Sequence, residues 1–161
     1  MTLPADLQTV PLEKAYRLIN HGPTVLDKST KTRAIIEQSG YFALQVPTLK
    51  QLKMVHQLGS ISLFQEPNKL DRCGVELFQF EHSPVPTVAG CAAWLICELI
   101  PEPHNQQAHD LFIGKVIAAY ADQRVFRDGH WYYHEVADEW KSIHHIAGGY
   151  FYSIGQPVSV E

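Results

Sequence analysis

The chain has 161 residues, 45% of them hydrophobic and 19% charged, and these proportions predict one globular domain spanning residues 1–161. Its formal net charge of −4, with a pI near 6.1, leaves no basic surface for nucleic acid, and no apolar run reaches the roughly 20 residues of a membrane helix. The polar start MTLPADLQTV lacks the features of a signal peptide, so we expect a cytoplasmic protein with no membrane partner.

Local patterns in the first sixty residues predict short helices that alternate with short strands. Apolar residues recur at helical spacing after Pro11, Gly40 is a typical helix end, and Thr48 is a suitable helix cap. The expected elements are a helix over 12–20 that ends at Gly22-Pro23, a brief strand over Thr24–Leu26, a helix over Thr32–Ser39, a strand over Tyr41–Val46 ended by Pro47, and a helix over Leu49–Leu58.

From residue 60 onward the patterns favour strands and loops. The runs Gly90–Ile100 and Leu111–Ala121 are long and apolar, so they should form the backbone of the sheet. The other expected elements are an irregular stretch over 60–72, a half-buried strand over Gly74–Phe80, a turn over Glu81–Pro86, a loop over Pro101–Asp110, a hairpin turn over Arg127–His130 and a last strand over Gly148–Ile154. Together they predict a small α+β domain that is mainly β.

Cysteines and histidines offer little for chemistry. The three cysteines are too few for a disulfide framework, and Cys91 and Cys97 lie in an apolar run, so buried reduced thiols are expected. The histidines form three close pairs, namely His104 with His109, His130 with His134, and His144 with His145. None has the HExxH or paired CxxC spacing of a zinc site, so we expect no metal. A GxSxG elbow is also absent from the sequence.

The segment from Asp27 to Arg33, which reads DKSTKTR, carries the main chemical signal. It combines backbone amides at a helix start with three hydroxyls and three cations, and these groups together hold phosphate in many proteins. A solvated helix start that Ser29 or Thr30 merely caps would have the same composition. The segment also lacks the glycine pattern of a nucleotide P-loop.

Several stretches together resemble the flavin reductase-like, FMN-binding split-barrel family, in the same order and over almost the whole chain. They are PLEKAYRLINHGPTV, DKSTKTRAIIEQSGYFALQVPT, the part from HQLGS to PNKLDRCGVEL, VAGCAAWLICEL, HDLFIGKV and AGGYF. The resemblance implies an antiparallel split β-barrel with flanking helices. It also implies a homodimer with FMN near the subunit interface, NAD(P)H as the electron donor, and flavin or a monooxygenase partner as recipient.

The same resemblance assigns candidate site residues. The FMN phosphate falls to five residues of the helix start, which are Lys28, Ser29, Thr30, Thr32 and Arg33. His109 and Tyr150 are further candidates near the flavin or the nicotinamide, although a structural histidine would explain His109 equally well. The resemblance assigns no catalytic residue.

The chain departs from the family just before this segment. Members have about a further hairpin between the strand matching Pro23–Leu26 and the turn at Asp27, whereas Val25-Leu26 here runs directly into Asp27. We therefore expect two early strands to be missing, which would leave unpaired edges and remove contacts to the flavin ring. An omitted segment, a natural or engineered deletion, and a rebuilt dimer would each explain the gap.

Two functions from different classes follow. The first is an FMN-dependent oxidoreductase of the flavin reductase type, in which the cofactor performs the hydride chemistry. The second is a non-catalytic dimeric remnant or interaction module that keeps the fold and has lost productive flavin binding.

Overall fold

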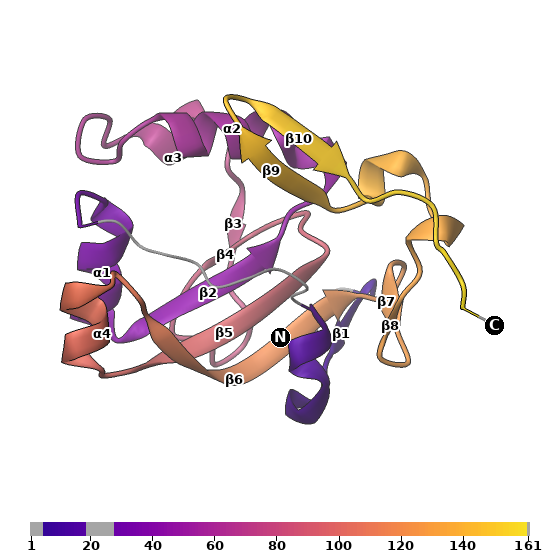
Figure 1. The fold of residues 1–161 in the computed structure, drawn as a ribbon, viewed down its shortest axis with the longest axis horizontal. Coiled ribbons are helices and arrows are strands. Elements are labelled where there is room, and N and C mark those ends of the chain that lie inside the picture. Colours follow the sequence, from indigo (N-terminus) through magenta and orange to yellow (C-terminus); the bar gives the residue numbers. More distant parts are fainter. Residues whose placement is uncertain (1–4, 19–27, 161) are drawn as a thin grey trace.

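A four-stranded antiparallel sheet forms the centre of the computed structural model, which describes residues 5–18 and 28–160 (Figure 1). Its strands, in spatial order, are β1 (Leu7–Thr9), β6 (Ile113–Asp122), β5 (Ala93–Ile100) and β2 (Tyr41–Val46). The two long apolar runs became β5 and β6, and the predicted strand over Tyr41–Val46 is β2, so these predictions are confirmed. The described strands do not close a barrel.

Three two-stranded hairpins accompany the sheet. They are β3 (Leu77–Phe78) with β4 (Thr87–Val88), β7 (Phe126–Arg127) with β8 (His130–Trp131), and β9 (Ile143–Ala147) with β10 (Tyr150–Ser153). The predicted turn over Arg127–His130 joins β7 to β8, and Asp128 and Gly129 both have positive φ angles there, as such turns require. The strand expected over Gly74–Phe80 is only two residues long, and the last predicted strand is β10.

Short helices fill most of the connections. They are η1 (Leu12–Leu18), α1 (Lys31–Ser39), η2 (Leu49–Gln51), α2 (Leu52–Ser60), α3 (Lys69–Arg72), α4 (Pro103–Ala108), η3 (Tyr133–Glu135) and η4 (Asp138–Trp140), where η marks a 3₁₀ helix. In the described ranges, none of them is long and apolar enough to cross a membrane. The helix expected after Pro11 is a 3₁₀ helix, and the strand expected over Thr24–Leu26 lies outside the described residues.

The ends of α1 confirm the sequence signals. The Thr30 hydroxyl accepts a hydrogen bond from the Arg33 amide at 3.4 Å, as an N-cap does. Gly40 has a φ of +74° and donates its N–H to the Ile36 carbonyl at 2.9 Å. The loop expected over Pro101–Asp110 was wrong in part because it contains α4, whose HNQQA sequence has no apolar face to reveal a helix.

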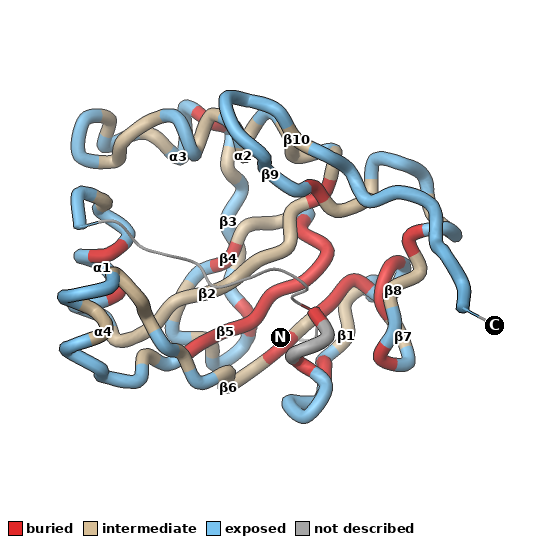
Figure 2. The backbone as a smooth tube through the Cα atoms, in the orientation of Figure 1, coloured by how far each residue is buried: buried red, intermediate tan, exposed pale blue. Residues whose placement is uncertain are grey.

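The core lies on both faces of β5. Residues 93–97 are each no more than 2% exposed, and Figure 2 shows this strand buried along most of its length. On one face, Leu95 packs with residues of β6 and η1, such as Ala119 and Leu18. On the other face, Trp94 packs against Phe80 and the β3–β4 hairpin. The sheet is therefore covered on both sides at its centre.

The neighbouring strand β2 is different. All six of its residues are only half-buried, and in the described part of the chain it pairs with β5 alone. Phe42, Leu44 and Val46 point to the same face as Leu95, where they border an apolar cavity. This face holds the candidate site.

Candidate functional site

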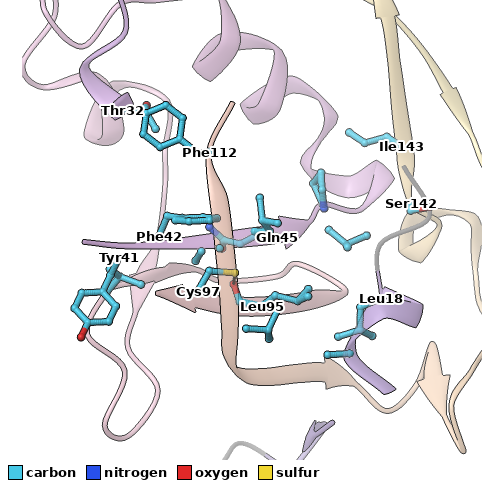
Figure 3. Close-up of a pocket in the computed structure, with 18 of the residues that line it drawn as sticks. Leu18, Thr32, Tyr41, Phe42, Gln45, Leu95, Cys97, Phe112, Ser142 and Ile143 are labelled. Atoms are coloured by element: carbon cyan, nitrogen blue, oxygen red, sulfur yellow. Dashed lines mark hydrogen bonds between the residues drawn. The ribbon is translucent and has the colours of Figure 1, made fainter. Parts of the chain in front are cut away.

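A cavity of about 1280 Å³ lies over the half-buried face of β2. Figure 3 shows Thr32 and Phe112 at one end, Ser142 and Ile143 at the other, and Phe42 and Cys97 along the floor. No Asp, Glu, Lys or Arg is among the described residues that line it. Its volume exceeds the 300–1,000 Å³ or so of ordinary small-molecule pockets, so it has room for a ring system as large as a flavin.

The floor of the cavity depends on a close approach between two strands. A Cβ atom at Gly114 of β6 would collide with the Phe42 ring and would lie 3.1 Å from the Cβ of Cys97. Glycine therefore lets the Phe42 ring rest on β6 beneath the cavity. The sequence showed this glycine within HDLFIGKV but gave no sign of its contact.

The predicted phosphate segment lies at the Thr32 end of this cavity. The described part of the segment begins at Lys28, since Asp27 and the Val25–Asp27 junction lie outside the described residues. Lys28, Ser29 and Thr32 are exposed, and Thr30 is half-buried where it caps α1. Thr32 also lines the cavity, so hydroxyls and lysines gather where an uncharged chamber begins. Acceptor-rich anions bind well to such a donor set.

Arg33 behaves differently from its neighbours because its side chain is only 8% exposed. Its Nε donates to Glu37 Oε1 at 3.0 Å, its Nη1 donates to Asp110 Oδ1, and its Nη2 donates to the Gln106 carbonyl at 2.7 Å. The guanidinium also lies 5.2 Å from the centre of the Phe112 ring. Arg33 thus joins α1 to the end of α4, and Figure 1 shows these two helices side by side.

Lys28 reaches the same helix end with a far more exposed side chain. Its Nζ donates to the Gln107 carbonyl at 2.6 Å and lies 4.0 Å from Asp110 Oδ1, yet 63% of the side chain is exposed. The last carbonyls of a helix have no partner within the helix, so cations are favoured beside them. Asp110 lies between the two cations and was not among the predicted site residues.

The other two predicted site residues lie outside the cavity lining. His109 is exposed at the C-terminal end of α4, where its ring meets the His104 ring edge-on with 5.4 Å between centres. Tyr150 begins β10 and is 76% exposed. Figure 1 places β10 beside α2, whereas α4 lies beside α1. The structure therefore brings His109 near the helix start and leaves Tyr150 on the hairpin.

Other cavity residues were not predicted from the sequence. Burial raises the pKa of the Tyr133 phenol, against an opposing hydrogen bond with Ser142. Trp131 stacks on Tyr133 with 4.9 Å between ring centres, and both line the cavity. The clustering of aromatic residues in WYY was the only sequence signal for this part of the cavity. It did not show which way the rings point, because their orientation is set by the β7–β8 hairpin and η3.

The three cysteines are free of disulfide bonds and buried, and burial is what the apolar run predicted for Cys91 and Cys97. Burial raises the pKa of Cys91 to about 12 and that of Cys97 to about 11, so both are neutral thiols at physiological pH. Cys97 lines the cavity, and Cys91 packs with Phe80 and Trp94. Across residues 5–18 and 28–160, no three His, Cys, Asp or Glu side chains are grouped to hold a metal ion.

Comparison with known proteins shows which family this chain belongs to. Residues 23–141 match the flavin reductase like domain, so the chain belongs to the flavin reductase like domain family. This agrees with the resemblance found in the sequence.

Individual relatives give the same result. A solved FMN-binding domain of a flavin reductases-like enzyme from Shewanella baltica OS155 has 46% sequence identity and a TM-score of 0.93, covering 96% of this chain and 97% of that one. The uncharacterized protein YddH of Escherichia coli (strain K12) is 29% identical over 184 residues, covering 93% of this chain and 96% of YddH. That alignment is longer than the 161 residues of this chain, so YddH has residues without a counterpart here.

A more distant solved structure shows the fold alone. Nitrilotriacetate monooxygenase component B from Bacillus cereus has 15% sequence identity and a TM-score of 0.66, covering 97% of this chain and 77% of that one.

Proposed function

We propose that this protein binds FMN and works as an oxidoreductase of the flavin reductase type, taking electrons from NAD(P)H. The observation that carries the proposal is the position of the segment Lys28–Arg33 at the end of a large uncharged cavity, with Thr32 belonging to both. A ligand with a dianionic phosphate at one end and an uncharged ring system at the other matches this arrangement.

The residues present suit FMN in kind. Lys28 supplies positive charge, Thr30 and Thr32 supply hydroxyls, and the first amides of α1 supply N–H donors for the phosphate. The apolar lining around Phe42 and Phe112 suits a planar ring. When bound, FMN would supply the hydride and electron transfer, and the protein's part is to bind it, orient it and keep water away.

Further parts of the proposal concern partners. We propose a cytoplasmic homodimer, in which a second subunit covers β2 and the exposed β9–β10 hairpin. Ile146, Tyr150 and Tyr152 are between 49% and 76% exposed on that hairpin, which supports a covering partner. The fold likeness to component B of a monooxygenase supports a monooxygenase as one recipient of reduced flavin.

The proposed loss of two early strands bears on whether FMN binds productively. Two observations support a missing segment: β2 has a neighbour on one side only within the described residues, and the YddH alignment contains positions that this chain lacks. They also favour the second candidate function, a remnant or interaction module without productive flavin binding. The half-buried state of all six β2 residues is the specific reason to keep it.

Titration with FMN separates the two functions. The purified protein should be yellow or should bind added FMN with a Kd in the low micromolar range or below, and it should then oxidise NADH or NADPH with flavin present. A colourless protein that ignores FMN at tens of micromolar would leave only the interaction module.

A further inference from the structure

The two cations that converge on the end of α4 are not equivalent in structure. Arg33 is 8% exposed and its three nitrogens are each engaged by a different partner, whereas Lys28 is 63% exposed and makes one hydrogen bond to the described part of the chain. Glu37 and Asp110 place two carboxylates against the Arg33 guanidinium, so its charge is compensated before any phosphate arrives. A phosphate near Arg33 would meet those carboxylates as well.

We infer that Arg33 and Asp110 are positioning residues that fasten α1 to α4, and that Lys28 is the cation that contacts the phosphate. This inference rests on the proposed FMN site and divides its two cations into separate roles. The sequence alone assigns both cations to the phosphate, because it does not reveal the contacts of Arg33 with Glu37, Asp110 and an α4 carbonyl.

The backbone at Asp110 supports a positioning role. Asp110 has a φ of +54°, in the left-handed region that non-glycine residues rarely adopt, directly after the end of α4. Residues in such conformations persist when surrounding contacts hold them, and they cluster at functional sites. Here the contacts are the Asp110 carboxylate with Arg33 Nη1 and, at 4.0 Å, with Lys28 Nζ. Asp110 therefore fixes Arg33, whereas its longer contact leaves the exposed Lys28 side chain far less constrained.

The shape of the guanidinium separates a role in positioning from a role in charge. Arg33 reaches Glu37, Asp110 and Gln106 in three directions at once, and a lysine ammonium at the end of a flexible stem cannot reproduce that fork. Arg33→Lys keeps the positive charge and loses the fastening. Asp110→Asn loosens the same contact while removing a negative charge, so pure electrostatics predicts that it strengthens phosphate binding.

The experiment compares the Kd values of FMN and riboflavin, which differ by the phosphate, in the full chain and its variants. Lys28→Ala should weaken FMN roughly tenfold or more and change riboflavin by less than about twofold. Arg33→Lys and Asp110→Asn should weaken both flavins by similar factors and lower the melting temperature. Lys53→Ala on α2, an exposed lysine away from the segment, is the charge-matched control and should leave both Kd values unchanged.

A measurement without flavin tests the fastening itself. Hydrogen exchange at the amides of Gln106 and His109, which bond to Glu102 and Asn105 carbonyls at 3.0 and 3.1 Å, should speed up in Arg33→Lys and stay unchanged in Lys28→Ala. This comparison remains available if Arg33→Ala fails to fold.

Failure of this inference and failure of the proposed FMN function would give different results. If Arg33→Ala weakens FMN selectively while Arg33→Lys binds both flavins normally, or if Asp110→Asn tightens FMN, Arg33 acts through its charge. The inference would then be wrong while the FMN site stands. If the unmodified protein binds neither flavin, the proposed function is wrong, and so is the assignment of Lys28 to the phosphate.

Discussion

The adjacent strands β5 and β2 share a sheet and a register, yet their surroundings differ. Residues 93–97 of β5 lie between two strands and are buried, even where Leu95 and Cys97 line the cavity, whereas β2 pairs with β5 alone in the described part of the chain and is half-buried throughout. The difference teaches that the sheet has a closed half that holds the fold together and an exposed half that presents the candidate site. Stability and function should therefore respond to different substitutions.

Paired leucines in the two strands give the largest expected contrast. Leu95 of β5 and Leu44 of β2 are direct partners across the ladder and point to the same face, but Leu95 is buried and Leu44 is half-buried beside the cavity. Leu95→Ala should cost about 2–5 kcal/mol of unfolding free energy, as buried leucines do. Leu44→Ala should cost less than about half of that, because part of its surface is already exposed.

Urea unfolding of the two variants measures this contrast directly. Equal losses would mean that β2 is as fully covered in solution as β5, as it would be inside a tight dimer. Repeating the measurement over a range of protein concentrations separates that case, because the stability of a dimer depends on concentration and that of a monomer does not.

The contact between Gly114 and Phe42 offers a second, intermediate test. In Gly114→Ala the new Cβ must displace the Phe42 ring, and overpacking of this kind costs about 1–3 kcal/mol. If β2 belongs to an exposed half, the ring has room to move into the cavity. The cost should then fall toward the low end and should shrink further in the double variant with Phe42→Leu.

Double-mutant analysis of unfolding free energies checks this coupling. Additive losses would show that Phe42 is not the obstacle, and a cost well above the range would show that the ring is locked in place. Gly59→Ala is a suitable control, because Gly59 lies in α2 and a Cβ there meets nothing within 4 Å.

Sequence patterns predicted the strands of the central sheet better than the contacts around the candidate site. The apolar run of β5 follows from its burial on both faces, and Gly40 encodes the end of α1 through its positive φ. The apolar run of β6 also revealed a strand, although most of its residues are half-buried or exposed. Polar α4 gave no periodicity, although its carbonyls meet the predicted phosphate segment. Contacts such as Arg33 with Asp110 join residues 77 positions apart, and no local rule predicts them.

The buried thiols of Cys91 and Cys97 give the smallest expected effect, which is a change of the unfolding free energy with pH. Burial raises the pKa of Cys91 to about 12 and that of Cys97 to about 11, whereas an unfolded thiol has a pKa near 8.5. The unfolded state therefore releases these protons first as the pH rises. Stability due to neutral thiols is complete below about pH 8.5 and declines until each folded pKa is passed, by about 1–2 kcal/mol per thiol at pH 10.

Urea unfolding at pH 8 and pH 10 tests this decline, with Cys73→Ala as the control because Cys73 lies outside the main sheet, just after α3. Cys91→Ala and Cys97→Ala should each flatten the decline. The flattening should be nearly equal for the two variants, because both folded thiols are still mostly protonated at pH 10. The two faces differ in access instead: neutral alkylating reagents should reach Cys97, whose residue lines the cavity, before Cys91. Faster alkylation of Cys91 would contradict the assignment of Cys97 to the cavity face and of Cys91 to the covered face, where it packs with Phe80 and Trp94.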